Sequence, residues 1–76
     1  MGNKVNYLRE AGIRSDLAAQ YEGSGKVADA RRLYIEAIKL MVKAKNLETD
    51  PKKAARIDLM IANCRAHMDR AGSLRL

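Results

Sequence analysis

The chain has 76 residues, and its 15 Lys and Arg against 9 Asp and Glu give a formal net charge of +6. This length holds one domain with a small core, and a composition of 47% hydrophobic and 32% charged residues is typical of a folded globular chain. One cysteine excludes an internal disulfide framework, and there is neither an apolar run approaching the roughly 18 residues of a membrane span nor a signal-peptide core. We therefore expect a small cytoplasmic module.

The first predicted element, residues 4–22, has an apolar pattern that changes side at Gly12. Two apolar sets lie on different sides of a helix: Val5, Leu8, Ala11 and Ala18 on one, and Ile13, Leu17 and Tyr21 on the other. Two interpretations are open. The segment is either one continuous long helix, kinked or buried on two sides, or a shorter helix over 13–22 that follows a frayed start.

The middle element, residues 26–48, follows a turn at 23–25, where two glycines tolerate the backbone angles of a helix stop. Its apolar side chains recur at three- and four-residue steps, as one face of a helix requires. The stripe consists of Ala30, Leu33, Tyr34, Ala37, Met41 and Ala44, widened by Ile38, Leu40 and Leu47. This is the clearest helix of the sequence.

The third element, residues 51–73, begins where Asp50 can cap a helix and Pro51 can occupy its first position at no cost in hydrogen bonds. Its apolar seam alternates four- and three-residue steps, which favours packing against neighbouring helices at a shallow angle. The seam consists of Ile57, Ile61, Cys64, Met68 and Ala71, joined by Met60.

No segment shows the alternation of a strand, and the connections are short, so consecutive helices should be antiparallel neighbours. The expected fold is all-α, an antiparallel up-down-up three-helix bundle formed by residues 1–76 as a single domain. The first and third helices then run parallel, each packed against the second. Two grooves follow, one between the second and third helices and one between the first and third.

Chemically reactive side chains are few. His67 is the only histidine and lies three residues after Cys64, so a helix places both on one face. Structural zinc needs four ligands, and no second Cys or His exists, so we expect a buried Cys beside a surface His. The sequence GSGK at 23–26 lacks the spacing of a phosphate-binding loop. We expect no catalysis, no cofactor and no metal.

The sequence GKVADARRLYIEAI at 25–38 resembles the signature G-x-(Y/hydrophobic)-x-x-A-x-x-x-Y-x-x-A-(I/L). Tetratricopeptide repeats and MIT (microtubule-interacting and trafficking) domains share that signature. Here the helix continues through 41–48 and no second copy follows, which favours the MIT family. ETDP at 48–51 is similar to the family's second turn, and MDRA at 68–71 to its closing motif. Ala18 and Glu22 fall where the family places an Ala and an acid, so the resemblance covers roughly residues 15–74.

The resemblance implies a tetratricopeptide-like bundle that binds peptides without catalysis. MIT domains bind C-terminal motifs of ESCRT-III-type subunits and recruit an attached effector, such as an AAA ATPase, for membrane remodelling. The ligand is either an amphipathic helix between the second and third helices or an extended, proline-containing strand between the first and third. By this resemblance we expect a cytoplasmic protein, monomeric as an isolated domain, that reaches endosomal membranes through its partners.

The predicted peptide-binding residues lie on one flank of the third helix. Because an α-helix turns by about 100° per residue, five of these residues fall within one narrow sector of the helix surface, and Asp69 lies near that sector. The five in the sector are Asp58, Ile61, Arg65, Met68 and Gly72. The resemblance gives Met68 the place of the family's groove leucine, whereas Gly72 replaces an acid that pairs there with a basic ligand residue. We expect Asp69 to pair with a ligand Arg or Lys and Arg65 to favour an acidic ligand position. The alternative is that Ile61 and Met68 belong to the core and the charges to a solvated face.

A basic patch is predicted around the second turn, from Lys43, Lys45, Lys52, Lys53 and Arg56. Such a patch would steer acidic partners, namely ESCRT-III tails, tubulin tails or anionic lipid, although a charge run of this kind is more often plain solvated surface. A basic helical module that binds nucleic acid is the alternative from another class. A third alternative is a self-associating helical adaptor that uses Val5, Leu8 and Ala11.

Overall fold

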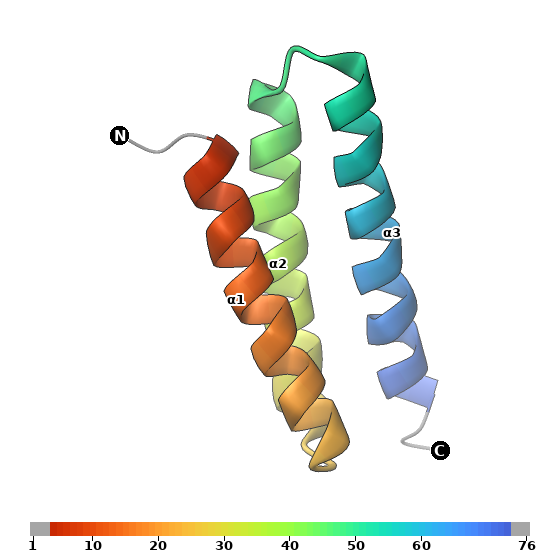
Figure 1. Cartoon of the computed structure of the whole chain (residues 1–76). Helices are drawn as coiled ribbons and strands as arrows, with labels where there is room; N and C mark the ends of the chain where they lie inside the picture. Colours follow the sequence, from red (N-terminus) through yellow and green to blue (C-terminus); the bar gives the residue numbers. More distant parts are fainter. Residues whose placement is uncertain (1–3, 74–76) are drawn as a thin grey trace.

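The computed structural model describes the backbone of residues 4–73 and the side chains of residues 5–70. It contains three α-helices: α1 (Lys4–Gly23), α2 (Val27–Leu47) and α3 (Pro51–Ser73). In Figure 1, α1 runs down, α2 runs up and α3 runs down again, so consecutive helices are antiparallel. This confirms the predicted all-α up-down-up bundle, and every predicted helix end agrees with the structure to within one residue.

The helix α2 is the central element of the bundle. Both α1 and α3 pack along α2, whereas α1 and α3 contact each other little (Figure 1). The Cα atoms extend over 41 × 22 × 13 Å, so the bundle is elongated. Because the outer helices do not close against each other, few side chains are fully buried and grooves run along the helix junctions.

The turn between α1 and α2 closes in the way that its glycines predict. Gly25 has a φ of +80°, in the left-handed region that favours glycine. The N–H of Lys26 donates to the carbonyl of Tyr21 at 2.9 Å, and the N–H of Gly25 to that of Glu22 at 3.1 Å. These two bonds form a Schellman motif, which satisfies the last carbonyls of α1 and reverses the chain.

The predicted cap of α3 is confirmed. The backbone N–H of Lys52 donates to Oδ1 of Asp50 at 2.9 Å, and the N–H of Ala54 donates to the carbonyl of Asp50 at the same distance. Pro51 therefore begins the helix at the one position where its missing N–H leaves nothing unsatisfied.

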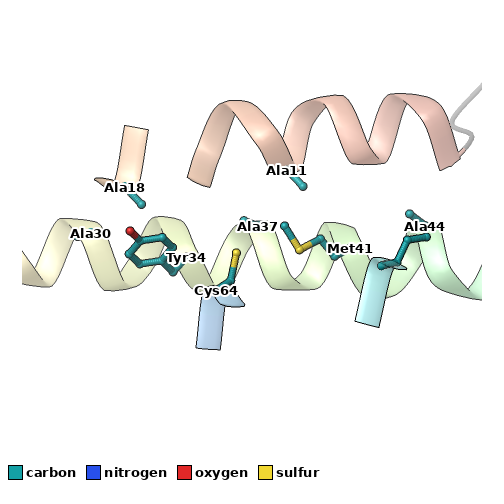
Figure 2. Packing of buried hydrophobic residues seen from close by; sticks show 9 residues of the cluster. Ala11, Ala18, Ala30, Tyr34, Ala37, Met41, Ala44 and Cys64 are labelled. Carbon is teal, nitrogen blue, oxygen red and sulfur yellow. The ribbon is translucent and has the colours of Figure 1, made fainter. Parts of the chain in front are cut away.

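The core is a set of seams that repeat every seven residues (Figure 2). Where α1 meets α2, fully buried alanines face one another, so the two backbones can approach closely. Larger side chains fill the space between α2 and α3. The buried residues are Ala11 and Ala18 of α1, Ala30, Tyr34, Ala37, Met41 and Ala44 of α2, and Ile57 and Cys64 of α3.

Several expectations about the helices are settled by the structure. Backbone helix runs without a break through Gly12, so α1 is the continuous helix and the frayed start is wrong. Leu47 was expected to widen the core, but it is 50% exposed because it lies at the very end of α2. Met60 is 36% exposed and lies beside the core, in a groove. The side chain of Ala71 lies outside the described residues.

No helix in the described part of the chain has both the length and the hydropathy that crossing a bilayer requires.

Candidate functional site: two grooves beside the central helix

The first groove runs between α2 and α3 and has a volume of about 390 Å³. Its lining consists of Val42, Lys45 and Asn46 from α2 and Asp58, Ile61, Ala62 and Arg65 from α3. Three of the six predicted peptide-binding residues, Asp58, Ile61 and Arg65, therefore lie together in one groove. The reason is their spacing, because three, four and seven residues return to the same flank of a helix.

An ion pair between Lys45 Nζ and Asp58 Oδ1, which are 2.8 Å apart, marks which residues of α2 and α3 lie opposite each other. Since α2 and α3 are antiparallel, each step back along α2 matches a step forward along α3. Val42 is therefore level with Ile61, and Ile35 is level with Met68. By helix spacing, Val42, Ile38 and Ile35 share one flank of α2, and Ile61 and Met68 share one flank of α3; we call these five side chains the apolar strip. Among them, Val42 and Ile61 line the groove, whereas Ile35 lines a separate hollow on α2.

The apolar strip is divided between core and surface. Ile38, Ile61 and Met68 pack against the buried core and are only partly exposed. Val42 is 41% exposed, and Ile35 is exposed as well. Ile61 both packs against the core and lines the groove, so the two interpretations are not exclusive for it. Met68 packs against the core and is not among the residues that line the groove.

The remaining predicted peptide-binding residues have different surroundings. Met68 packs against the core. Asp69 is exposed and takes part in an interaction of its own. Gly72 belongs to the last turns of α3, where side chains lie outside the described residues.

The five residues of the predicted basic patch are not brought together. Lys43 lies with its Nζ 5.9 Å from the ring centroid of Tyr7, on the α1 side of α2. Lys45 is on the opposite side of α2, paired with Asp58. The other three, Lys52, Lys53 and Arg56, are exposed in the first two turns of α3. Around the turn the charge is thus split between separate surfaces.

The second groove runs between α1 and α3 and has a volume of about 300 Å³. Tyr34 and Met41 of α2 form its floor, because α1 and α3 stand apart. Its walls consist of Ser15, Asp16 and Ala19 from α1 and Met60, Asn63, Cys64 and His67 from α3. The sequence predicts a groove at this place from topology, but not which residues line it.

A polar cluster closes one end of this second groove. The hydroxyl of Tyr34 donates to Glu22 Oε1 at 2.9 Å, and its ring stacks on that of His67 with centroids 5.6 Å apart. Nδ1 of His67 and Nε of Arg70 each lie 3.8 Å from a carboxylate oxygen of Glu22. Arg70 is also hydrogen-bonded to His67. The cluster links α1 to α3 at a point where the helices have few other contacts.

Burial and the Glu22 acceptor raise the pKa of Tyr34 to about 12, since the phenol is desolvated and its proton is held in a hydrogen bond. Burial also raises the pKa of the Cys64 thiol. A thiol that is buried and protonated is inert rather than nucleophilic. Cys64 is thus the buried cysteine that the sequence predicts, next to a partly exposed His67.

The groove between α2 and α3 combines apolar side chains with the charged Lys45, Asp58 and Arg65. The groove between α1 and α3 has an apolar floor, and Asp16 is the one acid in its lining. Among residues 5–70, no group of three or more His, Cys, Asp or Glu side chains is arranged to hold a metal ion. Comparison with known proteins finds no family model, no curated protein and no solved structure that matches this chain. At the level of fold, the chain is a small three-helix all-α domain.

Proposed function

We propose that this chain is a non-catalytic peptide-binding adaptor of the MIT type. Its ligands would be C-terminal segments of ESCRT-III-type proteins, and an attached effector, such as an AAA ATPase, would be recruited through it to sites of membrane remodelling. The observation that carries the proposal is the groove between α2 and α3, where the exposed Val42 and the partly exposed Ile61 lie between charged side chains.

The dimensions of the apolar strip support a helical ligand. Val42 and Ile35 are seven residues apart on α2, and Ile61 and Met68 are seven residues apart on α3. On a helix that spacing is two turns, or about 10.5 Å, which is also the spacing of the apolar anchors that an amphipathic helix presents at positions i and i+7. A ligand helix lying along this junction would therefore meet apolar surface once every two turns.

The residues that carry the MIT resemblance support the fold more than the ligand. Ala30 and Ala37 allow close packing in the core, Gly25 supplies the left-handed turn, and Tyr34 bonds to Glu22. Each of these roles is structural. The functional proposal therefore depends on the groove, and it needs a binding experiment.

The test is an NMR titration of the ¹⁵N-labelled chain with ESCRT-III C-terminal peptides of both types, helical and extended. Saturable shifts at Val42, Ile61 and Arg65 support the proposal. Saturable shifts at Ala19, Met60 and Asn63 keep a peptide-binding function and move it to the groove between α1 and α3. If neither peptide causes shifts at millimolar concentration, the proposal is wrong, and acidic tubulin tails and nucleic acid are titrated next.

Self-association is a second candidate, because large apolar side chains are exposed outside both grooves. Of the residues first considered for it, Ala11 is fully buried and Leu8 packs against the core, so only Val5 remains available. Ile13 and Leu59 are exposed as well. Sedimentation equilibrium distinguishes the two candidates, since a monomer at high micromolar concentration excludes this one.

A further inference from the structure

The outward side of α3 presents apolar side chains to solvent. Leu59 is 66% exposed, the highest value among the large apolar side chains of residues 5–70. It lies two residues from Ile57 and from Ile61, and two residues turn a helix by about 200°, so Leu59 points away from the core side of α3. The outer seam of α3 consists of the exposed residues at steps of four, three and four along this face, which are Ala55, Leu59, Ala62 and Ala66.

The outer seam repeats the spacing of the apolar residues that pack inside the molecule. On the core side, α3 also advances by four, three and four residues, through Ile57, Ile61, Cys64 and Met68. Because α3 packs along α2 and contacts α1 little, its far side faces no other described helix (Figure 1). A seven-residue period is the spacing with which one helix packs along another at a shallow angle. The outer seam therefore has the geometry to pack along a further helix.

Two opposite charges border the outer seam on one edge. Asp58 and Arg65 are seven residues apart, so they lie on the same edge of α3, two turns from each other. Both are exposed, and Arg65 forms no ion pair within the described part of the chain. Asp58 Oδ1 pairs with Lys45 at 2.8 Å, and a carboxylate can accept from more than one donor. An edge that carries an acid and a base two turns apart is complementary to an antiparallel copy of itself.

We propose that α3 packs against α3 of a second copy of this chain, antiparallel and related to it by a two-fold axis. In this arrangement Leu59 packs against Ala62 of the second copy. Asp58 then lies beside Arg65 of the second copy, and the symmetry forms this ion pair twice. The alanines of the outer seam let the two backbones approach closely, as the buried alanines do between α1 and α2.

The charges select one register and one direction. Sliding the antiparallel helices by one seven-residue period places either Asp58 beside Asp58 or Arg65 beside Arg65 of the second copy, and like charges repel. A parallel pair would place Arg65 beside Arg70 of the second copy. On the other edge of the proposed register, Arg56 meets the neutral Asn63 of the second copy. Only the proposed register therefore brings unlike charges together.

The contact is small, so the dimer should be weak. The outer seam extends over about 16 Å of helix, and a contact of about three turns buries less than the roughly 1,200 Å² of a stable interface. We therefore expect a Kd on the order of 100 µM. This inference gives a surface to the self-association considered above as a second candidate, and it is independent of peptide binding.

Sedimentation equilibrium of the whole chain between about 10 µM and 1 mM tests the proposal, and the apparent mass should rise from that of one chain towards that of two. Leu59→Lys should weaken the dimer at least about tenfold, because the two-fold axis removes the contact twice. The control is Ile13→Lys on α1, whose side chain is 55% exposed and which should change the Kd by less than about twofold. Circular dichroism checks that both variants fold.

Charge reversal tests the register. Asp58→Arg and Arg65→Asp each bring like charges together, so each variant alone should dimerise about tenfold more weakly than the parent chain. In an equimolar mixture of the two variants, each new charge faces an opposite one across the mixed dimer. The mixture should therefore associate about tenfold more tightly than either variant alone. The loss of the pair with Lys45 affects Asp58→Arg equally in both measurements, so the comparison cancels it.

The expected result is a dimer that Leu59→Lys abolishes and that the mixture of charge variants restores. A chain that stays monomeric at about 1 mM would overturn both this inference and self-association as a candidate. A dimer that Ile13→Lys abolishes and Leu59→Lys preserves would keep self-association and move it to α1, so the assignment to α3 would be wrong. If the mixture associates no better than its components, Asp58 and Arg65 do not set the pairing and the proposed register is wrong. The peptide titration is read separately, so each of these outcomes leaves the peptide-binding function to its own test.

Discussion

The hydroxyl of Tyr34 donates a 2.9 Å hydrogen bond to the carboxylate of Glu22, which ties the central helix to the end of α1. The same ring stacks on His67 of α3, so one side chain contacts all three helices. Because α1 and α3 contact each other little, this cluster is a principal link between the outer helices. Loss of its hydrogen bond should therefore be measurable in a chain this small.

Tyr34→Phe removes the donor and keeps the ring. The Glu22 side chain, only 16% exposed, then loses a partner that water cannot fully replace, so the free energy of unfolding should fall by about 1–2 kcal/mol. Urea denaturation followed by circular dichroism measures it. The control is Tyr7→Phe, whose hydroxyl has no hydrogen bond with another described residue and whose loss should cost less than about 0.5 kcal/mol. Equal losses would show that the hydrogen bond does not matter.

Stability should also fall at alkaline pH because the pKa of Tyr34 is raised to about 12. Between pH 10 and pH 12 the unfolded chain loses this proton and the folded chain keeps it, so rising pH favours unfolding. The contribution of Tyr34 is complete below pH 10 and is lost by about pH 12, an effect on the order of 2 kcal/mol. Urea denaturation at a series of pH values tests this, and Tyr34→Phe should flatten the decline. A tyrosinate absorbance titration in which all three tyrosines ionise near pH 10 would contradict it.

Two glycines should respond in opposite directions to alanine. Gly25 has a φ of +80°, which a Cβ disfavours, so Gly25→Ala should destabilise the chain by about 1 kcal/mol. Gly12 lies inside α1, and a Cβ added there meets nothing within 4 Å. Gly12→Ala should therefore stabilise the chain by about 0.5–1 kcal/mol through helix propensity. Thermal unfolding of the two variants provides the comparison, and destabilisation by Gly12→Ala would mean that α1 needs flexibility at this point.

Local chemistry explains why so much of the fold was predictable. The cap at Asp50, the turn at Gly25 and the stripe through Ala30, Tyr34 and Met41 each depend on residues close together in the sequence. The pattern on α1 was ambiguous because one of its two apolar sets is divided in the structure: Ile13 and Leu17 are exposed, whereas Tyr21 packs against the core. The spacing of apolar residues along a helix shows which side chains share a face of that helix. It does not show whether a neighbouring helix covers that face.

The site was less predictable because it depends on register between helices. Asp58, Ile61 and Arg65 share a flank of α3 by spacing alone, so the sequence gathers them correctly. That Lys45 pairs with Asp58, or that Val42 stands level with Ile61, follows only from how far α2 slides along α3. The basic patch shows the same limit, since nearness in sequence to the turn did not keep Lys43 and Lys45 on one side of α2.

A matched pair of substitutions should distinguish the two grooves. Val42 lies between α2 and α3, Met60 lies between α1 and α3, and they are similarly exposed, at 41% and 36%. Replacing either with Gln keeps the helix and removes apolar surface from one groove only. If a helical ligand uses the groove between α2 and α3, Val42→Gln should weaken its binding by about five- to tenfold, as expected for a central interface residue.

Met60→Gln is the control for that measurement and should leave the affinity of the helical peptide within about twofold, because interface residues outside the contact are close to neutral. Isothermal titration calorimetry measures both affinities. Thermal unfolding should show both variants within about 0.5 kcal/mol of the parent chain, since neither side chain is buried. The reverse pattern, with loss of binding in Met60→Gln alone, would assign the ligand to the groove whose floor is Tyr34 and Met41. Equal loss in both variants would mean that the peptide contacts both grooves and that neither alone accounts for recognition.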